Sequence, residues 1–210
     1  MVAPADLIVL TADANTEFGL HGIFQRHASL GTRCFTFEIR RHPERDPGCL
    51  RGAHDFLRPF AQMFRHALVV FDREGCGQDA KTRADLERQV EEALDRTWPE
   101  RRAAAIVIDP ELENWVWSES PHLEEVLGWS GRKPDLRSWL EQTYGVVQDT
   151  SKPRRPKEAL ETALREVRIP RSSAIYRELA DKVSLKQCRD PAFEKLKTTL
   201  VRWFPATRRA

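Results

Sequence analysis

The chain contains the stretch Leu68-Val69-Val70-Phe71-Asp72-Arg73-Glu74, in which an uninterrupted apolar run ends in two acidic residues. Short continuous apolar runs are typical of parallel strands that are buried on both faces of a sheet. The same arrangement occurs twice more, in Leu7-Ile8-Val9-Leu10 with Asp13 and Glu17, and in Ala105-Ile106-Val107-Ile108 with Asp109, Glu111 and Glu113. We therefore predict three buried strands, each of which is followed by carboxylates.

Helical patterns separate these runs. Apolar residues recur at helical spacing in three segments, at 17–27, 53–66 and 82–97. We expect a fourth strand at 33–39 and a loop, rich in Pro, Gly and charge, at 41–52. Strands that alternate with helices predict an α/β fold of Rossmann-like type. Its central sheet should be mainly parallel, with four strands or slightly more, and flanked by helices.

The pattern changes after residue 111, where helical segments dominate, at 111–118, 136–143, 157–167, 174–183 and 191–204. Residues 1–150 contain 18 Lys and Arg against 25 Asp and Glu, whereas residues 151–210 contain 16 against 7. We therefore predict an α/β core with its first post-sheet helices at 1–150, and a basic helical C-terminal region at 151–210 packed on that core. The basic region suits a polyanion, although a solvated helix surface would have the same composition.

Composition excludes several other classes. No apolar run approaches the roughly 20 residues of a membrane span, and no signal peptide is recognisable at the N-terminus. The four cysteines form no C-x-x-C pair and the six histidines show no H-x-x-x-H spacing, so a zinc site is not expected. No phosphate-binding glycine loop of the Walker or G-x-G-x-x-G type is present. We expect a cytoplasmic protein with no membrane partner.

The acidic residues that follow the three strands should meet at one edge of the sheet. Ligands of open α/β sheets bind beyond the carboxyl ends of the strands, so residues far apart in sequence can converge there. Carboxylates that lie this close repel one another unless a proton or a cation lies among them. Hard divalent cations prefer oxygen ligands, so we expect Mg²⁺ or Mn²⁺. The candidate metal ligands are Asp13, Glu17, Asp72, Glu74, Glu111 and Glu113.

Two of the acids also have a simpler interpretation. Glu17 would lie in the first turn of a helix, where a carboxylate interacts favourably with the helix dipole. Asp109 precedes Pro110, and this pair predicts a helix N-cap followed by proline at the first helical position. We therefore expect Asp109 to be a cap and leave it out of the ligand set.

Basic residues after the acidic segments could bind phosphate groups opposite the metal. Lysine binds phosphate as a point charge. The candidates are Lys133, Lys152 and Lys157, the last two in the Pro-rich linker at 151–157. The alternative is that this linker is simply solvated.

Four motifs, taken together, resemble a known family. The run Ala12-Asp13-Ala14-Asn15-Thr16-Glu17 resembles the V-E-G-x-T-E signature that opens Toprim-type domains, and Asp72-Arg73-Glu74 resembles their D-x-D strand end. The stretch Asp109-Pro110-Glu111-Leu112-Glu113-Asn114-Trp115 resembles the P-E-L-E-x-W element of a Toprim-like family of unknown function. That family is similar to the nuclease domains of OLD-type and RloB-type proteins. The segment at 185–193 resembles its closing helix.

The resemblance implies a Toprim fold, a Mg²⁺ or Mn²⁺ site and phosphodiester cleavage. It implies catalytic roles for Asp13, Glu17, Asp72, Glu74 and Glu113. It also implies a nuclease of an anti-phage defence system, with nucleic acid as substrate and a protein partner from the same locus. Two positions depart from the pattern, because Asp13 stands for the usual Glu and Glu74 for the usual Asp. These departures favour the alternative, a non-catalytic binding subunit of a defence complex with the same fold.

Overall fold

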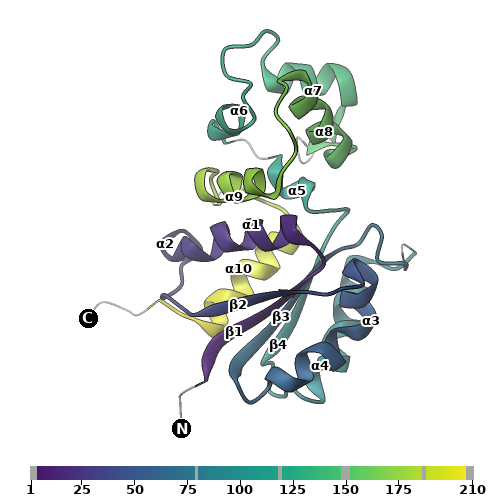
Figure 1. Ribbon diagram of the computed structural model, residues 1–210, viewed down its shortest axis with the longest axis vertical. Helices are drawn as coiled ribbons and strands as arrows, with labels where there is room; N and C mark the ends of the chain where they lie inside the picture. The colour runs from purple at the N-terminus through teal and green to yellow at the C-terminus, as the bar shows by residue number, and fades with distance from the viewer. Residues whose placement is uncertain (1–3, 79, 118–119, 148–151, 186–187, 207–210) are drawn as a thin grey trace.

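A sheet of four parallel strands forms the centre of the protein (Figure 1). The computed structural model describes residues 4–78, 80–117, 120–147, 152–185 and 188–206. The strands are β1 (Ala5–Thr11), β2 (Phe37–Arg41), β3 (Phe64–Asp72) and β4 (Ala103–Ile108), in the order β2-β1-β3-β4. All three pairings are parallel, so the carboxyl ends of the strands lie at one edge. The predicted α/β class with a parallel sheet flanked by helices is confirmed.

Helices cover both faces of the sheet (Figure 1). Alternate strand residues face two separate apolar clusters: Val9, Val70 and Ile106 belong to one, and Ile8, Val69 and Val107 to the other. The first cluster includes side chains of α1 (Ala14–Gln25), α2 (His27–Leu30) and α10 (Pro191–Trp203). The second includes side chains of α3 (Arg45–Leu57) and α4 (Arg83–Asp95), and the short helix η1 (Arg58–Phe60) follows α3. Burial on both faces explains why the strands read as continuous apolar runs.

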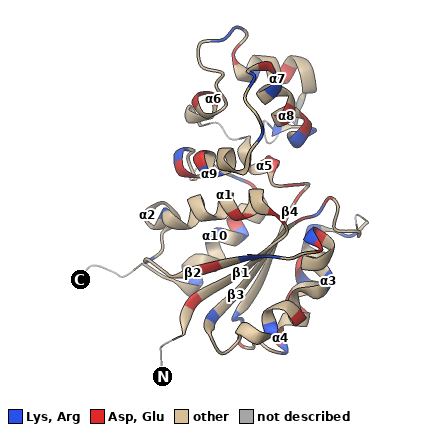
Figure 2. Ribbon diagram, in the orientation of Figure 1, with Lys and Arg blue, Asp and Glu red and all other residues tan. Residues whose placement is uncertain are grey.

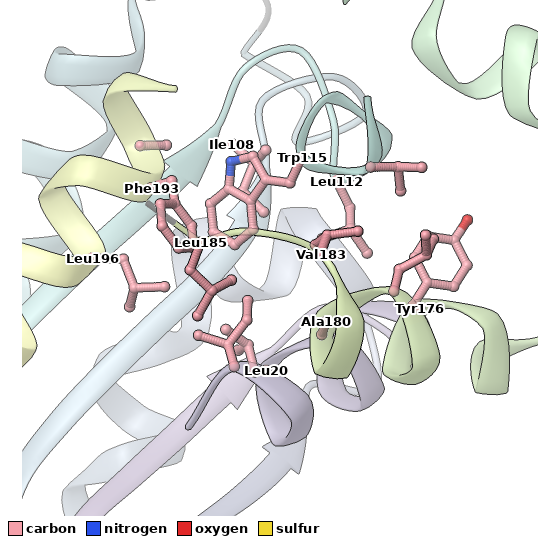
Figure 3. Packing of buried hydrophobic residues seen from close by; sticks show 14 of the residues in the cluster. Leu20, Ile108, Leu112, Trp115, Tyr176, Ala180, Val183, Leu185, Phe193 and Leu196 are labelled. Carbon is pink, nitrogen blue, oxygen red and sulfur yellow. The ribbon is translucent and has the colours of Figure 1, made fainter. Parts of the chain in front are cut away.

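A lobe of short helices extends from the carboxyl edge of the sheet (Figure 1). Its elements are α5 (Glu113–Val116), α6 (His122–Val126), α7 (Leu136–Tyr144), the antiparallel pair β5 (Val146–Val147) and β6 (Lys152–Pro153), α8 (Pro156–Glu166) and α9 (Ser173–Lys182). Helix α9 lies against α1 at such short range that a Cβ atom at Gly22 would be 2.6 Å from the Cβ of Ala180. Figure 3 shows the apolar packing beside this contact, where Trp115 and Leu185 meet Phe193.

Two helices begin where the sequence predicts, and one does not. The Thr82 side chain accepts from the Asp85 N–H at the start of α4, and Asp190 accepts from two N–H groups at the start of α10. These two helices begin where the helical segments predicted at 82–97 and 191–204 begin. The prediction that Asp109 caps a helix is wrong, because α5 begins only at Glu113. The Asp109 carboxylate instead accepts a hydrogen bond of 2.7 Å from Arg73 Nε.

The segment between β2 and β3 differs most from the prediction. Residues 45–52, expected to be a loop, form the first two turns of α3, and residues 64–66, expected to end a helix, begin β3. The unfavourable composition of α3 is tolerated because Pro47 lies in its first turn, where the missing N–H costs no helical hydrogen bond. Its two glycines, Gly48 and Gly52, lie directly under the imidazole ring of His42. Strand β2 begins at Phe37 and not at residue 33.

Helix α4 closes the sheet at its edge strand, β4. The N–H groups of Ala105 and Val107 donate to the carboxylates of Glu91 (3.0 Å) and Glu87 (3.1 Å), which lie one helical turn apart. Lys195 of α10 binds both carboxylates, at 2.7 Å and 3.1 Å. Unpaired strand edges promote aggregation, and these side chains satisfy donors that a fifth strand would otherwise use.

Glu87 also accepts a hydrogen bond from Arg83 at 2.6 Å. Replacing Glu87 by alanine should therefore lower the free energy of unfolding by about 2–4 kcal/mol, because the buried Val107 N–H and the cations Arg83 and Lys195 lose their acceptor. Urea unfolding followed by circular dichroism measures this change. Glu92→Ala is the matched control, since Glu92 is exposed on the same helix, and it should stay within about 0.5 kcal/mol. Equal effects of the two substitutions would contradict this account of the edge strand.

Within the described part of the chain, no helix has both the length and the apolar character that crossing a membrane requires.

Candidate functional site

Carboxylates from four segments gather where β1, β3 and β4 end. Burial is the main cause that raises the pKa of Asp72, and the negative charges of Asp46, Glu113 and Asp13 raise it further. These side chains therefore lie close enough to interact electrostatically. Figure 2 shows acidic positions at the start of α1 and along the segment between β4 and α5, at the carboxyl edge of the sheet. The structure thus brings together members of all three sequence clusters.

Asp72 lies at the centre of this group. It is the last residue of β3, and its Oδ1 atom is buried with no hydrogen-bond partner among the described residues. The backbone N–H of Leu112 donates a hydrogen bond to the carboxylate, which lowers its pKa, but burial raises the pKa by more. A carboxylate oxygen that is removed from water without a donor or a cation costs free energy. This orphaned atom is the observation at the site that points most directly to an ion.

Asp46 belongs to the group but was missed by the sequence analysis. It lies in the first turn of α3, and its Oδ1 atom accepts the backbone N–H of Asp72 at 2.9 Å. Burial is the main cause that raises the pKa of Asp46, and the charge of Asp13 adds to it. The only signal in the sequence is the Asp46-Pro47 pair, which is typical of a helix start, but the following residues lack an apolar repeat.

The two acids after β1 have separate partners. Asp13 is the N-cap of α1, and its Oδ1 atom accepts from the backbone N–H and the hydroxyl of Thr16, each at 2.9 Å. Glu17, one turn further on, forms an ion pair with Arg41 at 3.1 Å. Asp13 lies near the acidic group, since its charge raises the pKa values of Asp72 and Asp46, whereas Glu17 is paired with Arg41 at the end of β2.

The two buried acids after β4 are matched by cations from the helical lobe. Glu111 accepts the backbone N–H of Lys157 at 3.1 Å, and the Lys157 ammonium lies 3.5 Å from its carboxylate. Glu113 accepts from Arg171 at 2.7 Å and from the hydroxyl of Tyr176. Burial and the neighbouring Glu113 raise the pKa of Glu111, and the same two causes raise that of Tyr176. The charges of both glutamates are thus largely balanced.

The remaining predicted residues divide between the site and other places. Glu74 is exposed just after β3, and its charge contributes to the raised pKa of Glu111. Lys152 is nearly buried and lies 3.3 Å from Asp190, so it has a structural partner. Lys133 is exposed on the segment between α6 and α7, at the far end of the lobe from the sheet (Figure 1). Of the three predicted phosphate-binding lysines, Lys157 is the one beside the acidic group. The linker residue Ser151 and residues 186–187 of the closing motif lie outside the described residues.

The oxygen donors of this group suit a divalent cation, but their present arrangement does not form a complete set of ligands. Oxygen donors are the ligands that Mg²⁺ and Mn²⁺ prefer, and Asp72 Oδ1 lacks a partner. Among the residues that the structure describes, however, no three His, Cys, Asp or Glu side chains are arranged to hold a metal ion together. The reason is visible in the partners, because Asp13 caps a helix while Glu113 is paired with Arg171. Asp72 would hold such an ion together with Asp46 and Asp13, two of the carboxylates whose charges raise its pKa.

A polar cleft of about 930 Å³ opens beside the acidic group. Its lining comes from the turn after β1, the segment between β2 and α3, and the lobe, which contributes Lys157 and Arg171. Asp13 is part of this lining, so the cleft reaches the acidic group directly. Cations and carboxylates thus lie side by side. The cations are suited to an anionic ligand, and the carboxylates to a metal ion that contacts the same ligand.

Comparisons with known proteins give no guide to the role of this site. No protein-family model matches the chain, and neither a curated protein nor a solved structure was found to be similar to it.

Proposed function

We propose that this protein is a metal-dependent phosphodiester-cleaving enzyme, a nuclease that uses Mg²⁺ or Mn²⁺. The observation that carries the proposal is the Asp72 Oδ1 atom, buried without a partner among the carboxylates of Asp13, Asp46 and Glu113. A cation at this point would relieve the repulsion that raises the pKa of Asp72. The resemblance to Toprim-like nuclease domains in the motifs around Asp13, Asp72 and Glu113 agrees with this chemistry.

In this proposal each part of the site has a distinct role. Asp72, assisted by Asp46 and Asp13, holds the ion, which when bound polarises the scissile phosphate and lowers the pKa of water. Lys157 and Arg171 attract the phosphate and keep Glu111 and Glu113 balanced until substrate arrives. Arginine can bind a phosphate through two parallel hydrogen bonds, whereas lysine acts as a compact charge. The cleft beside Asp13 gives the substrate access.

The wider setting is proposed on the resemblance alone. We propose nucleic acid as the substrate, a cytoplasmic location, and a role in an anti-phage defence system together with a protein from the same locus.

A second candidate is a binding subunit without catalysis. It is favoured by the ion pairs that occupy Glu111 and Glu113, and by the lack of a three-ligand group among the described residues. The two candidates differ in whether millimolar metal binds to the carboxylates around Asp72. Metal binding with cleavage supports the enzyme, and nucleic-acid binding without metal binding supports the subunit.

The Asp46→Asn substitution tests the metal site. In the wild-type protein, Mn²⁺ at 100 times its dissociation constant should stabilise the fold by about 2.7 kcal/mol, because the ion binds only the folded state. Asp46→Asn removes one of the negative charges nearest to Asp72, so the stabilisation by the same metal concentration should fall to less than about half. Thermal unfolding at increasing Mn²⁺ measures both, together with cleavage of a labelled oligonucleotide.

Asp55→Asn is the control on the same helix, since Asp55 is exposed and, within the described ranges, its carboxylate pairs with His54 alone. It should respond to Mn²⁺ as the wild-type protein does. A melting temperature of the wild-type protein that does not change with Mn²⁺, together with no cleavage, would exclude the enzyme and leave the binding subunit.

A further inference from the structure

The cleft beside the acidic group is rich in cations. Arg41, Arg45, Lys157 and Arg171 line it, together with Arg40, whereas its acidic lining consists of Asp13 and Glu17. Arg45 is exposed, and its side chain forms no ion pair or hydrogen bond with any residue in the described ranges. The cleft therefore has an excess of positive charge, with at least one guanidinium that is not engaged by the protein itself.

An aromatic pair lies in the same cleft. The rings of His42 and Phe56 both line it, with their centroids 5.4 Å apart and their planes tilted by 44°. Both residues are partly exposed, so part of this surface is accessible to a ligand. This pair gives the cleft an apolar face beside its cations.

The position of the His42 ring is fixed by the sequence of α3. A Cβ atom at Gly48 would lie 1.9 Å from a ring atom of His42, and one at Gly52 would lie 2.9 Å away. Glycine disfavours a helix interior, so two glycines one turn apart make room for the ring at a cost to the helix. The His42 Nδ1 atom also accepts the backbone N–H of Glu44 at 3.1 Å. The ring is thus held on both its face and its edge.

The same contacts determine the chemical state of the imidazole. Because Nδ1 accepts a hydrogen bond, the proton of the neutral ring lies on Nε2. Burial is the main cause that lowers the pKa of His42, so the ring is neutral near pH 7. A neutral ring held in place is suited to stacking, and its Nε2–H remains available as a donor.

We propose that this cleft binds single-stranded nucleic acid, with the phosphates on Arg41, Arg45 and Lys157 and an unpaired base on the rings of His42 and Phe56. Aromatic side chains bind single strands by stacking on exposed base faces, whereas a duplex hides these faces inside its stack. The inference deepens the proposed function, on which it rests for the reaction, because it names the form of the substrate. The cleft reaches Asp13, so a bound strand would pass next to the candidate metal site.

Binding measured without metal tests the inference separately from cleavage. The probes are a fluorescein-labelled oligothymidylate and a labelled DNA hairpin duplex, titrated with the full chain in EDTA and followed by fluorescence anisotropy. The single strand should bind at least about tenfold more tightly than the duplex, because stacking contributes to the single strand alone.

Two variants assign the binding to the cleft. Phe56→Leu keeps an apolar side chain against the core and should weaken binding of the single strand about tenfold. Arg45→Gly removes the charge and relieves a positive φ of 51°, so the fold is not weakened. It should lower the slope of log affinity against log salt by about 0.7.

The controls are Phe60→Leu and Arg58→Gln, which change the same residue types outside the lining of the cleft. Phe60 packs on the same apolar cluster as Phe56, and Arg58 is exposed at the other end of α3. Both should bind the single strand like the wild-type protein.

The outcomes separate the inference from the proposed function. Binding of the duplex as tight as that of the single strand, or an unchanged affinity in Phe56→Leu and Arg45→Gly, would overturn the inference. Metal-dependent cleavage of the duplex would in that case leave the proposed function standing. Selective binding of the single strand without cleavage in Mn²⁺ would do the reverse, supporting the cleft as a binding site and removing the nuclease.

Discussion

Replacing Asp72 by asparagine is expected to reduce Mn²⁺-dependent cleavage by about a hundredfold or more, and yet to make the metal-free protein more stable. The loss of activity follows because the amide offers the ion one neutral oxygen in place of a carboxylate. The gain in stability follows because Asp72 Oδ1 is buried without a partner and the neighbouring carboxylates repel it. We expect a gain of about 1–2 kcal/mol in the free energy of unfolding at neutral pH.

The stability difference between Asp72→Asn and the wild-type protein should depend on pH. The pKa of Asp72 in the folded protein is raised, so the folded state holds the proton more tightly than the unfolded chain. The wild-type protein therefore loses stability as the pH rises from the ordinary carboxyl range through the raised pKa. A side-chain amide at this position cannot titrate, so the advantage of Asp72→Asn should be small near pH 4 and largest above the raised pKa. Thermal unfolding in EDTA across this range measures the difference.

Glu74→Gln is the control for stability, because Glu74 follows the same strand but is exposed. It should change the free energy of unfolding by no more than about 0.5 kcal/mol at any pH. An Asp72→Asn protein that is less stable than the wild type at neutral pH would show that favourable contacts of the carboxylate, such as the Leu112 N–H, outweigh its burial and the repulsion by its neighbours. Undiminished cleavage in the same variant would show that the metal lies elsewhere.

The sheet and its acidic edge could be predicted because they depend on local patterns. A strand that is buried on both faces must be apolar throughout, and parallel strands place the residues that follow them at one edge. The positions of Asp13, Asp72 and Glu113 follow from these two rules. The helix boundaries at Thr82 and Asp190 could be predicted for a similar reason, since a cap acts within three residues.

The first two turns of α3, with Asp46, could not be predicted, because they depend on a contact outside the helix. Gly48 and Gly52 weaken the helical pattern, and only the packed ring of His42 explains them. The sequence also did not indicate which charged residues form ion pairs and hydrogen bonds with one another. Arg171 and Tyr176 meet Glu113 across 58 and 63 residues of sequence, while Lys152 meets Asp190. Such pairs depend on how the helical lobe packs against the sheet, and a local sequence pattern contains no information about this packing.

Asp190→Ala is expected to be the most destabilising of the substitutions considered. Asp190 is 5% exposed, and its Oδ1 atom accepts from the backbone N–H groups of Ala192 and Phe193 at the start of α10. The same atom accepts the indole N–H of Trp115 at 3.0 Å. Its Oδ2 atom accepts from Asn114 at 2.7 Å and lies 3.3 Å from the Lys152 ammonium. One buried carboxylate thus joins α10, the start of α5 and strand β6.

Alanine at position 190 would leave all five donors without their acceptor, including a buried ammonium. The expected cost is about 3–5 kcal/mol, the usual range for breaking a buried ion pair. For a domain of this size, it would lower the melting temperature by about 10 °C. Asp135→Ala is the matched control, since Asp135 caps α7 in the same way but is exposed, and the hydrogen bonds of its side chain go to the first turn of its own helix. Loss of that cap should cost about 1 kcal/mol.

Asp190→Asn separates the two parts of this effect, because the amide oxygen can still cap α10 while the charge opposite Lys152 is lost. Its cost should lie between those of Asp190→Ala and Asp135→Ala in urea unfolding. Equal costs for Asp190→Ala and Asp135→Ala would mean that Asp190 acts only as a cap and that the contacts to Trp115 and Lys152 contribute nothing. Because Asn114 and Trp115 directly follow Glu113, Asp190→Ala should also loosen the position of that carboxylate. Cleavage in Asp190→Ala should therefore fall at temperatures where the protein is still folded.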